Sequence, residues 1–289
     1  MRKSGEVISK TPKPLSRYEA IAARAQRRRR LQLALPWLIA AGVLILWELA
    51  CQVFKIPVFV LPPPSAIAAS MAKWFSPLML NAGQTLMTTM VGFAIAICFG
   101  LVLGVAIGSS TLVYHGIYPL LIAFESVPKV AIVPILVLWF GIGTVPAIIT
   151  SFLIAFFPIA VNVSTGIATV EPELRDVLRS LGAKPLDIVR KIGIPRAMPY
   201  FFASLKIAIT FAFVGSIVSE TVGANKGIGH LIMLASSRFD VALVFSGLIV
   251  TSVMGVSMYL IARFIETRVI GWSMRGQQQQ ELQAASGSH

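Results

Sequence analysis

The amino-acid sequence predicts an all-α integral membrane protein with six transmembrane helices. Of its 289 residues, 56% are hydrophobic and only 13% are charged, and the mean hydropathy is +0.80. A helix that crosses a bilayer needs about 20 predominantly apolar residues, because its backbone polar groups must be hydrogen-bonded within the helix. Long apolar runs occur at residues 35–53, 82–108, 117–140, 145–168, 197–219 and 243–265.

The first apolar run directly follows a polar and basic segment, residues 1–34, which ends in four consecutive arginines. A signal peptide begins in a similar way. However, this run is long, contains Trp47 and Glu48, and shows no clear small-residue cleavage site, so we expect an uncleaved first helix. After the segment Leu61-Pro-Pro-Pro-Ser65, residues 67–75 are typical of a short amphipathic helix that lies along the membrane interface.

The basic residues predict the orientation of the chain. The net charge is +13, but the lysines and arginines flank apolar runs rather than alternating with aromatic residues on a soluble face, so we expect no nucleic-acid partner. With both termini in the cytoplasm, 20 of the 25 lysines and arginines fall on the cytoplasmic side. The positive-inside rule therefore favours a bacterial cytoplasmic membrane protein with cytoplasmic N- and C-termini.

Three regions are expected along the chain. Residues 1–34 form a basic cytoplasmic N-terminal segment, residues 35–272 form the six-helix transmembrane domain, and the glutamine-rich residues 273–289 form a disordered tail.

The longest cytoplasmic loop, residues 169–196, has a helical pattern. Pro172 suits the first position of a helix, and an apolar stripe follows it, at Leu174, Val177, Leu178 and Leu181. Gly182 is predicted to end this helix in a left-handed conformation, and Pro185 to open a second short helix that ends at Gly193 and Pro195. An apolar stripe outside the bilayer must be buried either against the chain's own spans or against a cytoplasmic partner.

Within this loop the spacing of certain residues resembles the EAA motif of ABC importer permeases. Asp176-Val-Leu178 is followed after three residues by Gly182, and after nine more by Ile192-Gly-Ile194-Pro195. The sequence departs from the motif at Asp176, which replaces glutamate, at Val177 and Leu178, which replace two alanines, and at Ile194, which replaces leucine. The gap lengths all match.

Further stretches resemble the nitrate, sulfonate, taurine and bicarbonate branch of that family, and the resemblance covers residues 35–272. These stretches are Leu61-Pro-Pro-Pro-Ser65, Val133-Pro-Ile-Leu-Val-Leu-Trp-Phe-Gly-Ile-Gly143, Ser180-Leu-Gly-Ala183 and Ser219-Glu-Thr-Val-Gly-Ala-Asn-Lys-Gly-Ile-Gly229. The resemblance implies a type I ABC importer permease fold. It also implies a homodimer of this chain, two cytoplasmic ATPase subunits and an external or periplasmic substrate-binding protein as partners.

The resemblance also implies that the loop is a coupling helix, which moves with the ATPase. The residues expected to form this ATPase-coupling site are Asp176, Leu178, Leu181, Gly182, Ile192 and Pro195. We expect Asp176 to meet a basic residue of the ATPase, and Leu178 and Leu181 to be buried anchors. The imported solute is expected to be a sulfonate, taurine, nitrate or a similar organic anion, or else a pyrimidine precursor of thiamine or an aromatic acid.

A translocation pathway and gate are predicted from polar residues in apolar surroundings. Glu125 and Lys129 lie four residues apart in the run 117–140, so they share one face if the helix is continuous, although Pro128 and Pro134 favour a bent or broken span. Because charges are costly in a bilayer, the pair should line a pathway or else fix helix packing. Glu220 and Gly223 lie in the glycine-rich stretch 219–229, which is expected to form an external gate or an ordinary external turn.

Enzymatic functions are not supported. No stretch fits the phosphate-binding pattern Gly-x-x-x-x-Gly-Lys-Ser/Thr, and the histidines His115, His230 and His289 are scattered. We therefore expect no cofactor or metal in this chain, and ATP hydrolysis by a separate subunit.

Two other classes of protein remain as alternatives. A proton- or sodium-coupled secondary carrier could use the polar residues of the spans, which are Glu48, Glu125, Lys129, Asn162 and Glu220. It would be marked by an inverted repeat, which the sequence does not show. A receptor or membrane-anchored scaffold would need a sizeable soluble domain, and none is present.

Overall fold

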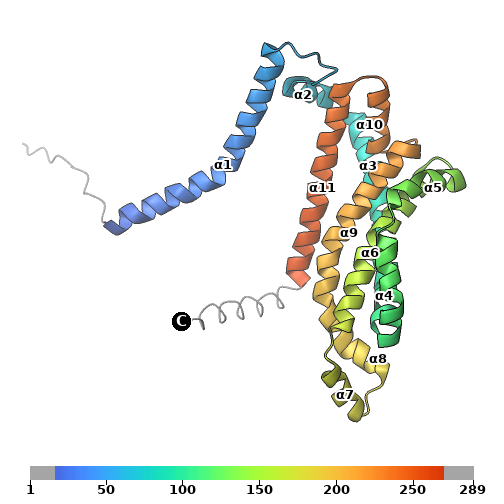
Figure 1. The fold of residues 1–289 in the computed structure, drawn as a ribbon. Coiled ribbons are helices and arrows are strands. Elements are labelled where there is room, and N and C mark those ends of the chain that lie inside the picture. The colour runs from blue at the N-terminus through green and yellow to red at the C-terminus, as the bar shows by residue number, and fades with distance from the viewer. Residues whose placement is uncertain (1–16, 270–289) are drawn as a thin grey trace, which may run out of the picture. The chain divides into compact units, whose positions relative to one another are not determined.

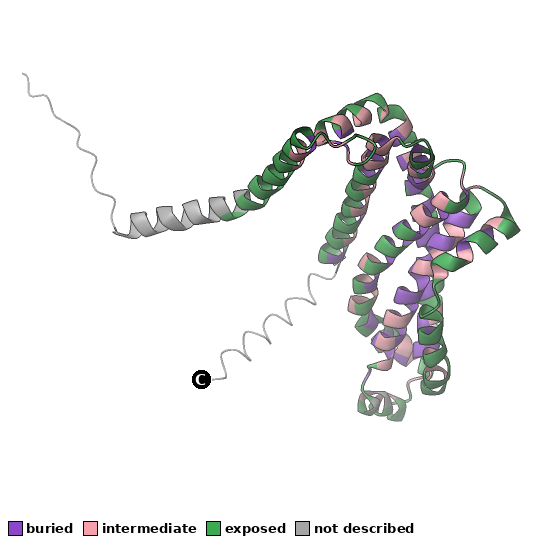
Figure 2. Ribbon diagram, turned by 45° about the horizontal axis from the view of Figure 1, so that its top comes forward, coloured by how far each residue is buried: buried purple, intermediate pink, exposed green. Residues whose placement is uncertain are grey.

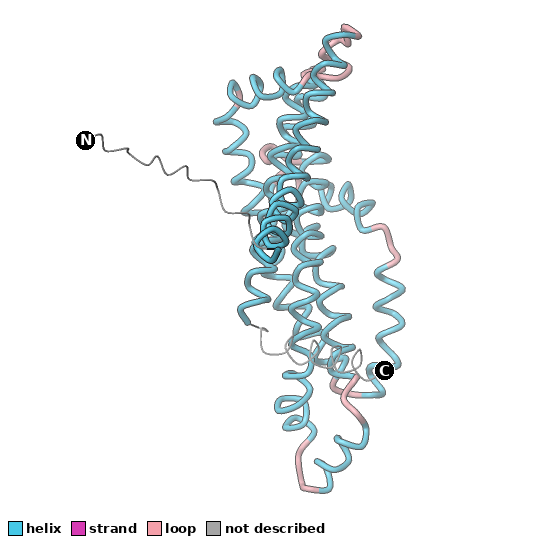
Figure 3. Tube along the Cα trace, turned by 90° about the vertical axis from the view of Figure 1, so that its left-hand side faces the viewer, coloured by secondary structure: helices cyan, strands magenta, loops and turns pink. Residues whose placement is uncertain are grey.

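The computed structural model describes residues 17–269 and divides into two units, Met1–Ser65 and Ala66–His289. Figure 3 shows the described residues as helices joined by short connections, with no strand among them. The helices are α1 (Arg17–Val53), α2 (Pro64–Lys73), α3 (Phe75–Gly108), α4 (Thr111–Glu125), α5 (Val133–Phe140), α6 (Thr144–Ala168), α7 (Pro172–Ser180), α8 (Pro185–Ile188), α9 (Ile194–Gly223), α10 (Ile228–Ser237) and α11 (Val241–Val269).

Five of these helical segments are long and apolar enough to cross a membrane: Leu35–Val53, Phe75–Gly108, Thr144–Ala168, Pro185–Gly223 and Val241–Arg268. A sixth candidate is a bent pair, in which Thr111–Glu125 and Lys129–Phe140 meet at an angle of 74°. The prediction of an all-helical membrane protein with six spans is therefore confirmed when the bent pair is counted as one span.

The first unit contains α1. This helix begins at Arg17, so it includes part of the basic N-terminal segment as well as the apolar run 35–53. Near the other end of this helix, the Glu48 carboxylate accepts hydrogen bonds from the Ser65 backbone N–H at 3.0 Å and from the Ser65 hydroxyl at 2.8 Å. Ser65 lies in the first turn of α2, where backbone N–H groups lack partners within the helix. Glu48 therefore caps α2.

The second unit is built around α3, α6 and α9, which lie side by side (Figure 1). The buried residues, purple in Figure 2, gather in this bundle. Along α3, glycines face α6 so closely that a Cβ at Gly104 would lie 2.7 Å from the Val163 Cβ. Small residues stabilise transmembrane helix pairs in this way, because the backbones can approach and gain van der Waals contact.

A second apolar cluster joins α10 to α3 and α11. Ile228 and Leu231 of α10 are buried together with Leu78 of α3, and with Leu243 and Val250 of α11. Helix α10 has only ten residues. It is too short to cross a bilayer, and the hydropathy pattern therefore did not predict it.

An ion pair inside the bundle links α9 to α11. The Lys206 ammonium lies 2.8 Å from the Glu266 carboxylate, and the two side chains are 26% and 11% exposed. Lys206 lies within α9. Its partner comes from the far end of the chain, so sequence spacing gave no sign of the pair.

The run 117–140 is broken, as Pro128 and Pro134 predict: α4 ends at Glu125, and a 3-10 turn, Lys129–Ile132, precedes α5. A boundary predicted in the coupling loop needs correction. The second short helix of the loop does not end at Gly193 and Pro195. Instead, α8 continues through a π-helical turn, Val189–Gly193, directly into α9. Pro195 comes directly after this π-helical turn, so the residue without a backbone N–H lies where the hydrogen-bond pattern of the continuous helix changes.

The other predicted helices are shifted at their ends. The interfacial helix expected at 67–75 spans Pro64–Lys73, and the run 82–108 begins earlier, at Phe75. The predicted tail, 273–289, lies outside the described residues.

Candidate coupling and gating sites

The loop 169–196 forms a helix, a tight turn and a second helix. The turn follows α7, where Gly182 has a φ of +83°. The Gly182 N–H donates to the Arg179 carbonyl at 2.9 Å, and the Ala183 N–H donates to the Leu178 carbonyl at 2.9 Å. This is the Schellman arrangement, which satisfies the last carbonyls of a helix and fixes the direction of the chain after it. The predicted left-handed stop at Gly182 is thus present.

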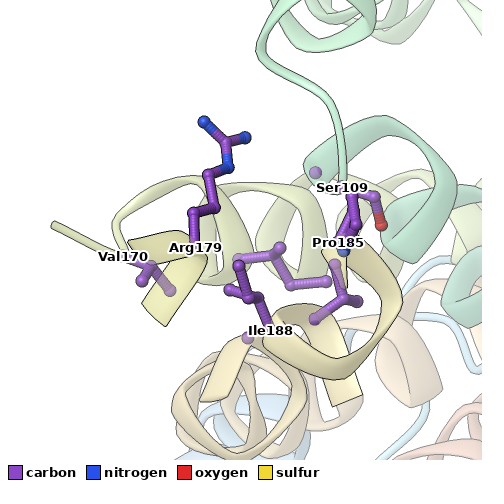
Figure 4. A pocket seen from close by; sticks show the side chains of 9 residues that line it. Ser109, Val170, Arg179, Pro185 and Ile188 are labelled. Atoms are coloured by element: carbon purple, nitrogen blue, oxygen red, sulfur yellow. The ribbon is translucent and has the colours of Figure 1, made fainter. Parts of the chain in front are cut away.

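One side of this loop packs on the chain's own spans. Ile188 of α8 is 7% exposed, and a Cβ at Gly193 would lie 3.3 Å from the Ile167 side chain of α6. In Figure 4, Ile188 and Pro185 lie together on the wall of a small pocket, whereas the Arg179 side chain extends away from them. The second helix of the loop therefore packs on the end of α6, and it is continuous with α9.

The other side of the loop is apolar and exposed. Val177, Leu181 and Leu186 have exposed fractions of 56%, 78% and 77%. A groove of about 340 Å³ adjoins them. The residues that line it are Leu178, Leu181, Gly182, Ala183, Asp187, Ile188, Lys191 and Ile192. We call this surface the coupling groove.

Four of the six predicted coupling residues meet in the coupling groove: Leu178, Leu181, Gly182 and Ile192. Asp176 and Pro195 are not among its lining residues. Asp176 is exposed and lies 3.6 Å from the Arg179 guanidinium on the same helix. An exposed ion pair of this kind contributes about 0.2 to 1 kcal/mol to stability, so Asp176 would lose little by leaving Arg179 for a basic residue of a partner.

At the opposite end of the bundle, Glu220 is the centre of a buried polar network and is only 2% exposed. Its carboxylate accepts hydrogen bonds from the Thr85 hydroxyl at 2.8 Å and from the Gly229 N–H at 3.1 Å. Longer bonds come from Ser216 at 3.3 Å and from Thr88 at 3.4 Å. A carboxylate buried in an apolar bundle needs such donors, because an unpaired charge there is very costly.

This network holds the N-terminus of α10. The Ile228 N–H donates to the Thr85 hydroxyl at 2.8 Å, and the Gly227 N–H donates to the Asn81 side-chain oxygen at 2.8 Å. Together with the Gly229 N–H, these are donors of the first turn of α10, which have no acceptor within that helix. Glu220 also places negative charge at the positive end of the helix dipole.

Glycines allow the close packing around the network. Gly227 has a φ of +118°, and a Cβ at this position would overlap the Glu220 carboxyl. Gly223, the last residue of α9, packs against α5, where its Cβ would lie 2.6 Å from a Val137 methyl carbon. The Gly223 carbonyl accepts a hydrogen bond of 3.1 Å from the Gly143 N–H. Glu220 and Gly223 thus join four elements: α3, α5, α9 and α10.

Glu125 and Lys129 lie elsewhere, at the break between α4 and α5. The Lys129 ammonium donates to the backbone carbonyl of Glu125 at 2.9 Å. The ion pairs among the described side chains do not include these two residues. They do not form a close ion pair because the helix ends at Glu125, so the two side chains do not share a continuous helical face. Their charges still interact over a longer distance.

Sequence reasoning missed the partners of Glu220. Thr85 and Thr88 are separated from Glu220 by more than 130 residues, and only their three-residue spacing in an apolar run hinted at a polar face on α3.

A match to a protein family now identifies the chain. Residues 96–271 match the family described as the binding-protein-dependent transport system inner membrane component. The chain belongs to this family. It is therefore an ABC importer permease, a multi-pass component of the inner membrane.

Relatives resemble the permease over most of its length. It is 28% identical over 245 residues to a probable ABC transporter permease protein of Haemophilus influenzae, covering 85% of this chain and 100% of that protein. It is 27% identical over 246 residues to a formylaminopyrimidine transport permease of Halalkalibacterium halodurans, covering 85% and 98%. It is 25% identical over 241 residues to the taurine transport permease of Escherichia coli, covering 81% and 87%.

A solved structure resembles the permease in fold. The match is to an inward-facing conformation of the MetNI methionine ABC transporter, with a TM-score of 0.60 and 21% identity. It covers 68% of this chain and 98% of that chain. The expected type I importer permease fold is confirmed.

Proposed function

We propose that this permease forms half of a translocation pathway and is driven by a separate ATPase that docks in the coupling groove. The observation that carries the proposal is the exposure of Leu181 and Leu186, each more than 75% accessible, beside a turn held by Gly182. Exposed leucines on a rigid edge gain stability when a partner covers them. Because α8 is continuous with α9, a displacement of the groove would be transmitted into the bundle.

The proposed assembly contains two copies of the permease, two cytoplasmic ATPase subunits and an external or periplasmic substrate-binding protein. Membership of a binding-protein-dependent family supports these partners, and a two-fold pathway needs a second copy. The excess of basic residues beside the coupling groove and at both termini supports a cytoplasmic location for them. The α10 end of the bundle, with Glu220 and Gly223, would then face outward as a gate below the binding protein.

The proposed solute is a small polar molecule such as nitrate, taurine, a sulfonate or a similar small organic anion. Relatives are named for aliphatic sulfonate, taurine and nitrate transport, which supports this range. A pyrimidine precursor of thiamine is one alternative, supported by the relative named for formylaminopyrimidine transport, and an aromatic acid is another. We propose that Glu125 and Lys129 line the pathway, and that the chain itself holds no cofactor.

The contacts of the polar residues favour a proton- or sodium-coupled secondary carrier less than an ATP-driven permease. Glu48 caps α2, the Asn162 side chain donates to the Pro158 carbonyl at 2.8 Å, and Glu220 caps α10. Each is bound locally, and none of the hydrogen bonds among described residues connects the three into a relay. Uptake that continues after collapse of the proton gradient, while ATP is maintained, would separate ATP-driven import from proton-coupled transport.

Docking is tested by Leu181→Glu, which places a charge on the exposed rim of the groove. We expect the variant to insert and dimerise normally, while capture of the ATPase by the tagged permease falls at least tenfold, about 1.4 kcal/mol of binding free energy. Leu181→Met is the matched control, because it keeps an apolar side chain of similar volume. Undiminished capture and normal uptake by Leu181→Glu would show that the groove is not the docking site.

A further inference from the structure

The break between α4 and α5 opens onto an apolar cavity that neither the coupling loop nor the α10 network uses. Its volume is about 310 Å³. The residues that line it are Phe124, Val127, Lys129, Ile132, Leu153, Phe156 and Phe157. Binding sites for small molecules are concave and mostly apolar, with a few placed polar groups, and this cavity has that composition.

Lys129 is the only charged residue in this lining. Its ammonium has three N–H donors, and one is used on the Glu125 carbonyl. The ammonium also lies 4.7 Å from the centre of the Phe157 ring, which holds it over the cavity wall. Two N–H donors are left to receive an anionic group, which would share the Lys129 charge with Glu125.

Phenylalanine rings form the rest of the wall. Phe156 and Phe157 are 7% and 8% exposed, and their ring centres lie 4.0 Å apart. Phe124, from the last turn of α4, is 62% exposed and borders the opening. An apolar cavity of roughly 150 Å³ can hold a benzene molecule. The larger volume here therefore has room for one ring together with an anionic substituent.

The lining also disfavours other solutes. None of the lining residues is acidic, and Glu125, whose charge interacts with Lys129, is not part of the lining. The ammonium group of a cation or a zwitterion would therefore meet no carboxylate within the cavity wall. An inorganic anion such as nitrate could meet Lys129, but it has no apolar surface to place against the rings. A zwitterion or an inorganic anion would thus use only part of the site.

We propose that this cavity is a binding site for the transported solute, and that the solute class is a single-ring organic anion, an aromatic sulfonate or carboxylate. The anionic group would bind Lys129, and the ring would pack on Phe156 and Phe157. The inference rests on the proposed function, since it assigns a solute to the proposed pathway.

The test measures binding of benzenesulfonate to the full-length permease in lipid nanodiscs by isothermal titration calorimetry, with methanesulfonate and nitrate as comparison probes. We expect benzenesulfonate to bind at least tenfold more tightly than either comparison anion. Lys129→Gln should weaken benzenesulfonate binding at least tenfold, and Lys129→Arg should restore most of it because the positive charge is kept.

Lys73→Gln is the matched control, since Lys73 also lies near an aromatic ring, at 5.9 Å from the centre of Trp74. It should leave binding unchanged. Equal affinity for all three anions, no binding, or unchanged binding in Lys129→Gln would overturn the proposal. Capture of the ATPase is measured on the same preparations. Capture without benzenesulfonate binding refutes only the solute site, whereas loss of capture by the unaltered permease refutes the proposed function.

Discussion

At the scale of single residues, Glu220 organises the α10 end of the bundle. One carboxylate accepts hydrogen bonds from donors on α3, α9 and α10, and all of them are buried or nearly so. Removing a buried acceptor leaves its donors unsatisfied, at about 1 to 3 kcal/mol for each group. The position of α10 therefore depends on polar contacts as much as on its apolar face.

Gly227 is the residue whose substitution tests this packing most directly. Gly227→Ala should destabilise the permease by about 2 to 4 kcal/mol, because the new methyl group overlaps the Glu220 carboxyl and the positive φ disfavours an L side chain. The measurement is the thermal unfolding midpoint of the purified protein, together with uptake.

The control for Gly227→Ala is Gly83→Ala on α3, where no described residue outside the local helix backbone has an atom within 4 Å of the added Cβ. This change should be neutral or slightly stabilising, since alanine favours a helix by up to about 1 kcal/mol over glycine. Equal unfolding midpoints for the two variants would show that the Glu220 network does not constrain α10.

At the scale of elements, the coupling loop was largely predictable, because its signals are local. Pro172, Gly182 and Pro185 fix a helix, a left-handed stop and a second start from neighbouring residues alone. The continuity of α8 with α9 was not predictable, since proline and glycine usually end a helix. Burial of Ile188 and packing of Gly193 against α6 outweigh that local tendency.

The α10 element and its network show the opposite case. A ten-residue apolar helix is too short to register as a span, and its caps come from Asn81 and Thr85, more than 140 residues away. Glu220 and Gly223 were predicted as gate residues from composition, but their contacts were not. Hydrogen bonds between residues so far apart in the chain depend on how the helices pack. The spacing of residues along a single sequence does not show this packing.

Gly182 provides the prediction at this scale. Asparagine tolerates a left-handed conformation better than most residues, so Gly182→Asn should keep the Schellman turn and most of the ATPase capture. Gly182→Asp can adopt the same conformation but adds a negative charge to the coupling groove, and it should abolish transport while the protein still inserts. Co-purification of the ATPase and uptake into cells are the two measurements.

The comparison of these two variants separates backbone geometry from surface charge. Among the residues that the structure describes, none beyond the chain neighbours of Gly182 has an atom within 4 Å of a Cβ at this position, so neither side chain meets a steric clash there. If Gly182→Asn loses capture as completely as Gly182→Asp, the partner needs a bare glycine rather than a left-handed turn. Full activity of Gly182→Asp would contradict any role of this turn in coupling.

At the scale of the whole molecule, the coupling groove and the Glu220 network lie at opposite ends of the same helix. The span Pro185–Gly223 begins in the coupling groove and ends at Gly223, three residues after Glu220. A tilt of this helix would therefore displace both ends, because a packed helix moves as a rigid body rather than bending freely. This arrangement requires that the coupling groove and the α10 network face opposite sides of the membrane.

That requirement gives the last prediction, which concerns topology. In a background of Cys51→Ala and Cys98→Ala, an exposed residue at each end is replaced by cysteine, Asn225→Cys near α10 and Lys184→Cys in the coupling loop. A membrane-impermeant maleimide should label position 225 in intact cells, and position 184 only after the membrane is permeabilised, because basic segments stay in the cytoplasm. Labelling of position 184 alone in intact cells would show that the orientation is the reverse of the one predicted. Labelling of both positions would contradict a coupling groove and a gate on opposite sides of the membrane.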